Sequence, residues 1–305
     1  MKPSTKKVIF AAMTANLLIA GTKFCAAWST GSSAILSEGV HSLVDTGNQV
    51  LLLYGLHRAE RPPDEQFPFG HGKEIYFWSF VVAILIFALG AGISLYEGIL
   101  HLLHPSPLEN PFIIYIIITA ALVFEGVSWV ISIREFRRQE KSRMGFLQAI
   151  RKGKDPSLFL VVMEDSAAML GLLVALAGIS LTQLTGSPLF DGTASVVIGL
   201  ILGVTAMLLA RETKGLLIGE AADVETVRAI RKILIDGKYV DHVNEVLTLH
   251  MGPDFVVTTV SLDFADHVPA GEVERTVVEL ETAIRNRVPE VKKVFIEAEA
   301  WRRPK

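Results

Sequence analysis

The stretch SAILSEGVHSLVDTGNQVLLLY, residues 33–54, is long and apolar enough to cross a bilayer, yet it carries His41 and Asp45 in its middle. These two residues lie one helical turn apart, so in a helix they share one face. An uncompensated charge near the bilayer centre costs roughly 3 kcal/mol on insertion scales. Such a pair can serve packing alone when it is hydrogen-bonded, but its cost makes it a candidate functional site.

Half of the 305 residues are hydrophobic and the mean hydropathy is +0.43, which is typical of membrane proteins. The apolar residues gather into six stretches, each near the roughly 20 residues that a helix needs to cross a bilayer. These predicted spans are Val8–Trp28, Ser33–Tyr54, Ile75–Leu102, Pro111–Ile133, Pro156–Leu181 and Asp191–Ala210. We interpret the first as a mature helix and not as a signal peptide, because no small-residue cleavage site follows it.

The basic residues predict how these spans are oriented. Lys and Arg occur in the N-terminal segment and in alternate connections, whereas the connections 30–32, 104–110 and 182–190 contain neither. The positive-inside rule then puts both termini in the cytoplasm, with a multi-pass topology of six helices. The basic inner loops and the lack of a cleaved targeting segment suit a bacterial inner membrane.

Composition also argues against several classes of function. The formal net charge of −3 disfavours a nucleic-acid partner, and Cys25 is the only cysteine, so an internal disulfide or a thiolate metal cluster is excluded. An intramembrane hydrolase would need a nucleophile or an activated water, and no HExxH or GxSxG motif occurs. We therefore expect a protein that is not an enzyme and that has no prosthetic group.

The pattern changes near residue 216 to that of a small soluble domain. Its predicted elements are helix Val224–Ile235, strand Val243–His250, strand Phe255–Phe264, helix Ala270–Val288 and strand Val291–Glu299. This αββαβ order predicts a ferredoxin-like α+β domain with an antiparallel sheet, spanning 216–305 after a transmembrane domain at 1–215. A domain of this size has a limited core, so dimerisation would stabilise it.

Further acids lie at the depth of Asp45. With about 1.5 Å of rise per residue, Asp45 and Asp165 both lie about 14 Å from the cytoplasmic ends of their helices, and Glu125 lies at about 12 Å. Glu164 adjoins Asp165. Four carboxylates at one level would cost on the order of 10 kcal/mol on insertion scales, which rivals the stability of a whole domain.

This cost has to be compensated, and the basic residues inside the spans do not suffice. Lys23 lies near the outer end of the first span, where we expect its side chain to snorkel toward the headgroups. Protons can neutralise some of the acids and a divalent cation can neutralise others. Imidazole with carboxylates suits zinc, and also manganese, iron or cobalt, whereas calcium and magnesium prefer oxygen-only sites. Glu38 lies on the stripe of His41 and Asp45 and could line an access path, or it is a solvated helix-end acid.

The His41-xxx-Asp45 motif, the segment Phe69-Gly70-His71-Gly72-Lys73-xx-Tyr76, the six spans and the αββαβ tail together resemble the cation diffusion facilitator family. The resemblance implies a homodimeric exporter of zinc or a related divalent ion, which exchanges the metal for protons. It also implies a tetrahedral site on the second and fifth helices, of which His41, Asp45 and Asp165 match three positions.

Val161 stands at the fourth position, so Glu164, Glu125 or water would have to complete the site. The resemblance implies a second metal site in the loop after the second helix, at Asp64 and His71, although a glycine-flanked turn explains His71 equally well. A membrane-embedded sensor or scaffold that binds metal without transporting it remains the alternative function.

Overall fold

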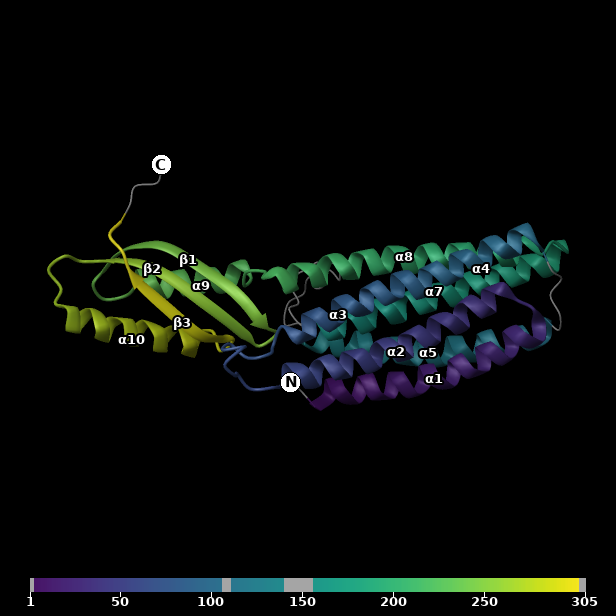
Figure 1. Cartoon of the computed structure of the whole chain (residues 1–305), viewed down its shortest axis with the longest axis horizontal. Helices are drawn as coiled ribbons and strands as arrows, with labels where there is room; N and C mark the ends of the chain where they lie inside the picture. The colour runs from purple at the N-terminus through teal and green to yellow at the C-terminus, as the bar shows by residue number, and fades with distance from the viewer. Residues whose placement is uncertain (1–2, 106–110, 140–155, 302–305) are drawn as a thin grey trace. The chain divides into compact units, whose positions relative to one another are not determined.

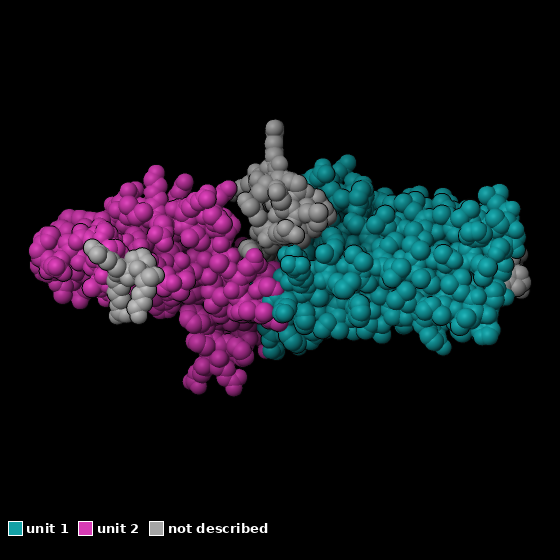
Figure 2. All heavy atoms as spheres, turned by 90° about the horizontal axis from the view of Figure 1, so that it is seen from above, with its two compact units in different colours: residues 1–58, 74–214 teal, residues 59–73, 215–305 magenta. Residues whose placement is uncertain are grey.

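The computed structural model describes residues 3–105, 111–139 and 156–301, which form two compact units (Figure 2). Unit 1 comprises residues 1–58 and 74–214, and unit 2 comprises residues 59–73 and 215–305. The basic connection at 140–155, which contributed to the predicted orientation, lies outside the described residues.

Unit 1 is a bundle of long helices that run side by side (Figure 1). Its elements are α1 (Pro3–Thr30), α2 (Ser33–Ala59), α3 (Glu74–Leu85), the π-helix η1 (Ile86–Ala91), α4 (Gly92–Leu103), α5 (Pro111–Gln139), α7 (Pro156–Thr185) and α8 (Leu189–Ile218). The segments α3, η1 and α4 are consecutive and make one 30-residue span. The bundle core is mainly aliphatic and draws on α1, α2, η1, α5, α7 and α8.

Four stretches of the described residues are long and apolar enough to cross a membrane. They are Glu74–Leu103, Phe112–Arg138, Pro156–Thr185 and Leu189–Ile218. The helix α2 is not among them because of its polar residues, but those residues are buried, while Leu43 and Val50 on its outer face are exposed. The prediction of a membrane protein is thus supported, and the crossing of the membrane by α1 and α2 stays a prediction.

Unit 2 has the predicted order of elements. They are α9 (Val224–Ile235), β1 (Val240–Gly252), β2 (Phe255–Phe264), α10 (Ala270–Arg287) and β3 (Val291–Ala298). Both helices contribute to one core, in which Leu234 and Ile284 pack with Val260 of the sheet.

The predicted antiparallel sheet is wrong in one respect. The strands lie in the order β1-β2-β3, and β1 pairs with β2 antiparallel as expected, but β2 pairs with β3 in parallel. The physical reason is the connection, since α10 carries the chain back along the sheet before β3 begins, and such crossovers join parallel strands.

Unit 2 also includes the loop 59–73, which the predicted division at residue 215 did not foresee. Phe69 meets Phe295 of β3 edge to face, with ring centroids 6.5 Å apart. Gly72 lies so close to the β1–β2 turn that an added Cβ would collide with the Met251 carbonyl oxygen. The loop that carries Asp64 and His71 therefore packs against the sheet.

Candidate metal centre

In the described parts of α1, α2, α5 and α7, seven ionisable side chains are buried inside the helix bundle of unit 1. Each is at most 2 % exposed, and they are Lys23 of α1, Glu38, His41 and Asp45 of α2, Glu125 of α5, and Glu164 and Asp165 of α7. The burial of charges at this density requires pairing, protonation or a bound ion. All five acids predicted or considered from the sequence thus lie in the interior.

His41 and Asp45 form the pair predicted from their spacing. The Nδ1 atom of His41 lies 3.3 Å from Oδ1 of Asp45. Neither ring nitrogen of His41 has a hydrogen-bond partner among the described residues, and neither does Oδ1 of Asp45. A buried imidazole with both nitrogens unpartnered is available to bind a cation or a proton.

Glu164 is the acid of α7 that faces Asp45. The two carboxyl groups are within hydrogen-bonding reach of each other, and Asn48 donates a 2.8 Å hydrogen bond from Nδ2 to Oε1 of Glu164. Two carboxyl groups in such contact repel unless a proton or a cation lies between them. The sequence had favoured Asp165, because it matches the family pattern.

Asp165 instead contacts α5. Its Oδ2 atom accepts a 2.7 Å hydrogen bond from Ser132 and a 3.3 Å hydrogen bond from Ser128. Among the described residues there is no cluster of three or more His, Cys, Asp or Glu side chains arranged to hold a metal ion. The structure therefore does not bring His41, Asp45 and Asp165 together, and their joint ligation stays a prediction.

Glu125 of α5 lies among the other acids. Its charge acts on Asp45, Glu164 and Asp165, and its Oε1 atom has no hydrogen-bond partner in the described part of the chain. The electrostatic influence of Glu125 therefore reaches acids of both α2 and α7. This position suits a group that takes up a proton or contributes a further ligand.

Lys23 does not snorkel as expected. It is 1 % exposed, and its ammonium lies 3.2 Å from Oε2 of Glu38 and donates a 2.8 Å hydrogen bond to Oγ of Ser42. The reason is that α2 offers an acid and a hydroxyl directly beside it, so the buried ion pair replaces the headgroup contact.

The loop pair Asp64 and His71 is in contact, with Nε2 of His71 2.9 Å from Oδ2 of Asp64. The Oδ1 atom of Asp64 accepts hydrogen bonds from the backbone N–H groups of Gln66 and Phe67, which makes a turn. The hydrogen bond from His71 and then these backbone donors lower the pKa of the Asp64 carboxyl below its ordinary value. The ring of Phe67 packs on His71, with centroids 4.6 Å apart. No third ligand joins this pair among the described residues.

Several polar residues of the centre were missed from the sequence. They are Asn48 and Gln49 of α2 and Ser128 and Ser132 of α5, all of which lie near the acids along their helices. A signal for Asn48 was present, because it follows His41 by seven residues and so lies on the same helical stripe. The serines carried no such signal, since hydroxyl groups are common in apolar helices.

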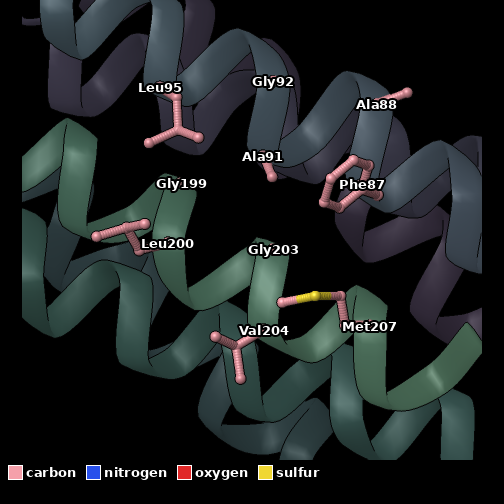
Figure 3. A pocket seen from close by; sticks show the side chains of 10 residues that line it. All are labelled: Phe87, Ala88, Ala91, Gly92, Leu95, Gly199, Leu200, Gly203, Val204 and Met207. Carbon is pink, nitrogen blue, oxygen red and sulfur yellow. The ribbon is translucent and has the colours of Figure 1, made fainter. Parts of the chain in front are cut away.

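Unit 1 also contains an apolar cavity of about 330 Å³ between the α3–η1–α4 span and α8 (Figure 3). Its lining includes Phe87, Leu95, Leu200 and Met207 and contains no ionisable side chain. Such a lining cannot bind a metal ion, so this cavity is separate in character from the buried acids.

Residues 9–218 match the family model described as the cation efflux transmembrane domain. The chain is 36 % identical over 263 residues to a protein of Xenopus laevis named proton-coupled zinc antiporter SLC30A9, mitochondrial; the match covers 86 % of this chain and 47 % of that protein. It is 32 % identical to metal tolerance protein C4 of Arabidopsis thaliana, covering 85 % of this chain and 57 % of that protein. It is 26 % identical to cation-efflux pump FieF of Escherichia coli, covering 93 % and 89 %.

The chain thus spans about half the length of the first of these relatives. The expected bacterial inner membrane finds no support in the SLC30A9 proteins, because those relatives are named as mitochondrial.

Proposed function

Because the chain belongs to the cation efflux family of membrane transporters, we propose that it moves a divalent metal cation, with zinc as the leading candidate, across its membrane in exchange for protons. Efflux of divalent cations is the activity that the relatives' names support most broadly. The name of the first relatives supports zinc as the cargo and protons as the coupling ion, and the donor types in the buried centre support zinc.

One observation supports this proposal most strongly. The buried centre holds many polar atoms without a hydrogen-bond partner among the described residues, and they occur on α2, α5 and α7 together. They are Oε1 of Glu38, both ring nitrogens of His41, Oδ1 of Asp45, Oε1 of Glu125 and Oε2 of Glu164. Each such atom costs about 1–3 kcal/mol if nothing satisfies it. A cargo that alternates between metal ions and protons would satisfy them in turn.

The chemistry of the donors fits a divalent cargo. His41 and Asp45 would bind the ion from α2, and Glu164 or Asp165 would bind it from α7. Metal binding requires the carboxylates and the imidazole to be deprotonated, so each ion that binds releases protons. Protons that arrive from the other side would displace the ion and reset the carrier, with Glu125 as a further acceptor.

Transport requires that the centre open to one side at a time. The contact of Asp45 with Glu164 links α2 to α7, and the hydrogen bonds of Asp165 link α7 to α5. A rotation of α7 relative to α2 would bring Asp165 toward His41 and Asp45. We propose this rearrangement as the step that assembles the ligands, with Asp64 and His71, in the loop that follows α2, attracting metal from the cytoplasm.

The test is zinc uptake into proteoliposomes that contain an internal metal dye and an internal pH dye. Saturable zinc flux with opposing proton movement is expected, and Asp45→Ala should abolish both. A matched control is Glu97→Gln, which removes a half-buried carboxyl of α4 outside the centre and should leave the flux intact. Flux that persists in a folded Asp45→Ala variant would overturn the assignment of this site.

The second candidate function is a membrane-embedded metal sensor or scaffold. It is favoured by one observation, which is that the predicted ligands are not gathered into a cluster in the described residues. A sensor would bind zinc without any flux. Zinc binding to the purified protein, together with no uptake in proteoliposomes of either orientation, would favour it over transport.

We also propose that the protein is a homodimer through unit 2. The face of the sheet opposite the helices exposes Leu247 of β1 and Phe295 of β3, at 54 % and 50 %. A second copy would cover apolar area that the small core of unit 2 leaves in water. Light scattering of the detergent-solubilised protein tests this, and a monomer at micromolar concentration would contradict it.

A further inference from the structure

A lysine ammonium fills a cation-binding pocket directly beside the candidate metal centre. The Nζ atom of Lys23 lies 2.8 Å from Oγ of Ser42, 3.2 Å from Oε2 of Glu38 and 3.5 Å from the Glu38 carbonyl oxygen. All three oxygens belong to α2. Lys23, Glu38 and Ser42 are each at most 1 % exposed. A carboxylate, a hydroxyl and a carbonyl that converge on one buried point are the donor types of a cation site.

This pocket lies on the helical stripe of the metal centre. Ser42 is adjacent to His41, and Glu38 precedes His41 by three residues on α2. At about 1.5 Å of rise per residue, Glu38 is displaced by about 4.5 Å toward the start of α2. The pocket is therefore a neighbour of the centre, displaced toward the end of the bundle at which α2 begins.

The surroundings hold the ion pair in place. Gly39 of α2 lies beside the Lys23 stem, where an added Cβ would make van der Waals contact with Cβ of Lys23 at 3.4 Å. Gly171 of α7 leaves room for the Glu38 carboxylate, since a Cβ there would collide with its Oε1 atom. That Oε1 atom has no hydrogen-bond partner among the described residues. One carboxylate oxygen of Glu38 is thus available as a ligand for a cation, and it faces α7, the helix that carries Glu164.

The charge of Lys23 also reaches the metal centre, where it acts on His41, Asp45 and Glu125. The ammonium of Lys23 would repel a divalent ion bound by His41 and Asp45. Both cations are stabilised by the same nearby carboxylates.

We propose that Glu38 and Ser42 form a second cation subsite on the outward path of the metal, and that Lys23 occupies this subsite as a tethered competitor. The inference deepens the proposed transport function and rests on it. While Lys23 is in place, the subsite cannot take a metal ion and the affinity of the neighbouring centre is kept low enough for release. A metal ion that moves outward displaces the ammonium from Glu38, and the ammonium returns when the ion has left.

The test is equilibrium zinc binding to the purified full-length protein in detergent, measured by titration calorimetry. Lys23→Met removes the competing charge, so zinc should bind about tenfold tighter or more. Lys23→Gln also deletes the charge but keeps a hydrogen-bond donor for Glu38 and Ser42. Its zinc affinity should match that expected for Lys23→Met, so it provides the same test if Lys23→Met does not fold. Lys23→Arg keeps the charge and serves as the matched control, with an affinity close to that of the wild type.

Substitution of Glu38, the partner of Lys23, should change the zinc affinity in the opposite direction. Glu38→Gln leaves the ammonium uncompensated beside the centre, so zinc binding should weaken by about tenfold or more. The double variant Lys23→Gln/Glu38→Gln carries neither charge and should return to within about threefold of the wild type. This order of affinities distinguishes a competitor from a structural ion pair, which would change thermal stability without changing the affinity of the folded protein.

A folded Lys23→Gln variant that binds zinc no more tightly than the wild type would overturn the inference. Binding in detergent does not depend on transport, so the two proposals fail separately. Absence of zinc flux in the wild type would overturn the proposed function while the affinity order is still measured. Normal flux with equal affinities in all Lys23 variants would overturn only the role of Lys23.

Discussion

The hydrogen bond between Asn48 and Glu164 connects α2 to α7 at the centre, and its removal should destabilise the metal-free protein measurably. Asn48→Leu conserves the approximate volume of the side chain but deletes the donor that lies 2.8 Å from Oε1 of Glu164. A hydrogen bond to a carboxylate contributes about 1.5–3 kcal/mol, and both residues are buried, so water cannot replace the lost donor. A loss of about 2 kcal/mol corresponds to a fall in melting temperature of roughly 4–8 °C for a chain of this order of size.

Gln49 provides a matched control at the next position of the same helix. It is equally buried, but neither its Nε2 nor its Oε1 atom has a hydrogen-bond partner among the described residues. Burying an unpaired amide costs about 1–3 kcal/mol, so Gln49→Leu should leave the stability unchanged or raise it. The opposite outcomes at adjacent positions separate a specific hydrogen bond from a general effect of lost polarity.

The assay is the thermal melting of both purified variants and the wild type in the same detergent without metal, followed by tryptophan fluorescence at one scan rate. Saturating zinc should stabilise every variant that keeps the centre, by about 2.7 kcal/mol at a hundredfold excess over the dissociation constant. Equal melting temperatures for Asn48→Leu and the wild type, or an equal fall in both variants, would refute the reasoning.

Three further predictions concern unit 2. Gly72→Ala should loosen the loop 59–73, because the new Cβ collides with the Met251 carbonyl oxygen, so endoproteinase Glu-C should cleave after the exposed Glu65 faster. Gly271→Ala, which meets nothing within 4 Å, should not change the cleavage, and equal rates for Gly72→Ala and the wild type would contradict the packing. Leu234→Ala in the unit 2 core should lower the free energy of unfolding by about 2–5 kcal/mol, whereas the exposed Val278→Ala should have little effect in the same denaturant titration. The lowered pKa of Asp64 means that its contribution to loop stability is present above the ordinary carboxyl pKa near 4 and is lost as the pH falls through the lowered value. Amide exchange at Gln66 and Phe67 should therefore accelerate below about pH 4 beyond the intrinsic pH effect, and Asp64→Asn should remove that transition; protection that is independent of pH in the wild type would contradict it.

Much of the fold was predictable because its signals are local. A long apolar run predicts a buried or membrane helix whatever its neighbours are, and Pro156 begins α7 as a first-turn proline should. The order of elements in unit 2 followed from alternating and helical periodicity. The parallel pairing of β3 with β2 was not found, because strand direction depends on the path of α10 over the sheet and not on the strand's own residues.

The candidate site also had features that the sequence predicted and features that it did not. The burial of His41, Asp45, Glu125, Glu164 and Asp165 was expected from their positions within apolar segments, and the structure confirms that burial. Which acid meets which partner was not predictable, because a rotation of α7 by the angle between adjacent residues exchanges Glu164 for Asp165.

The sequence by itself determined that ionisable groups lie deep inside a helical membrane protein, since the length and apolarity of each segment govern its burial. Only the tertiary structure decided that Asp45 meets Glu164, that Asp165 meets the serines of α5, and that Lys23 is neutralised by Glu38. These contacts join residues up to 119 positions apart, and they depend on how the helices are rotated and packed against one another. Hydrophobic patterning specifies which face of a helix turns inward to within about a hundred degrees, whereas a hydrogen bond or an ion pair requires the partners to be placed within a few tenths of an ångström.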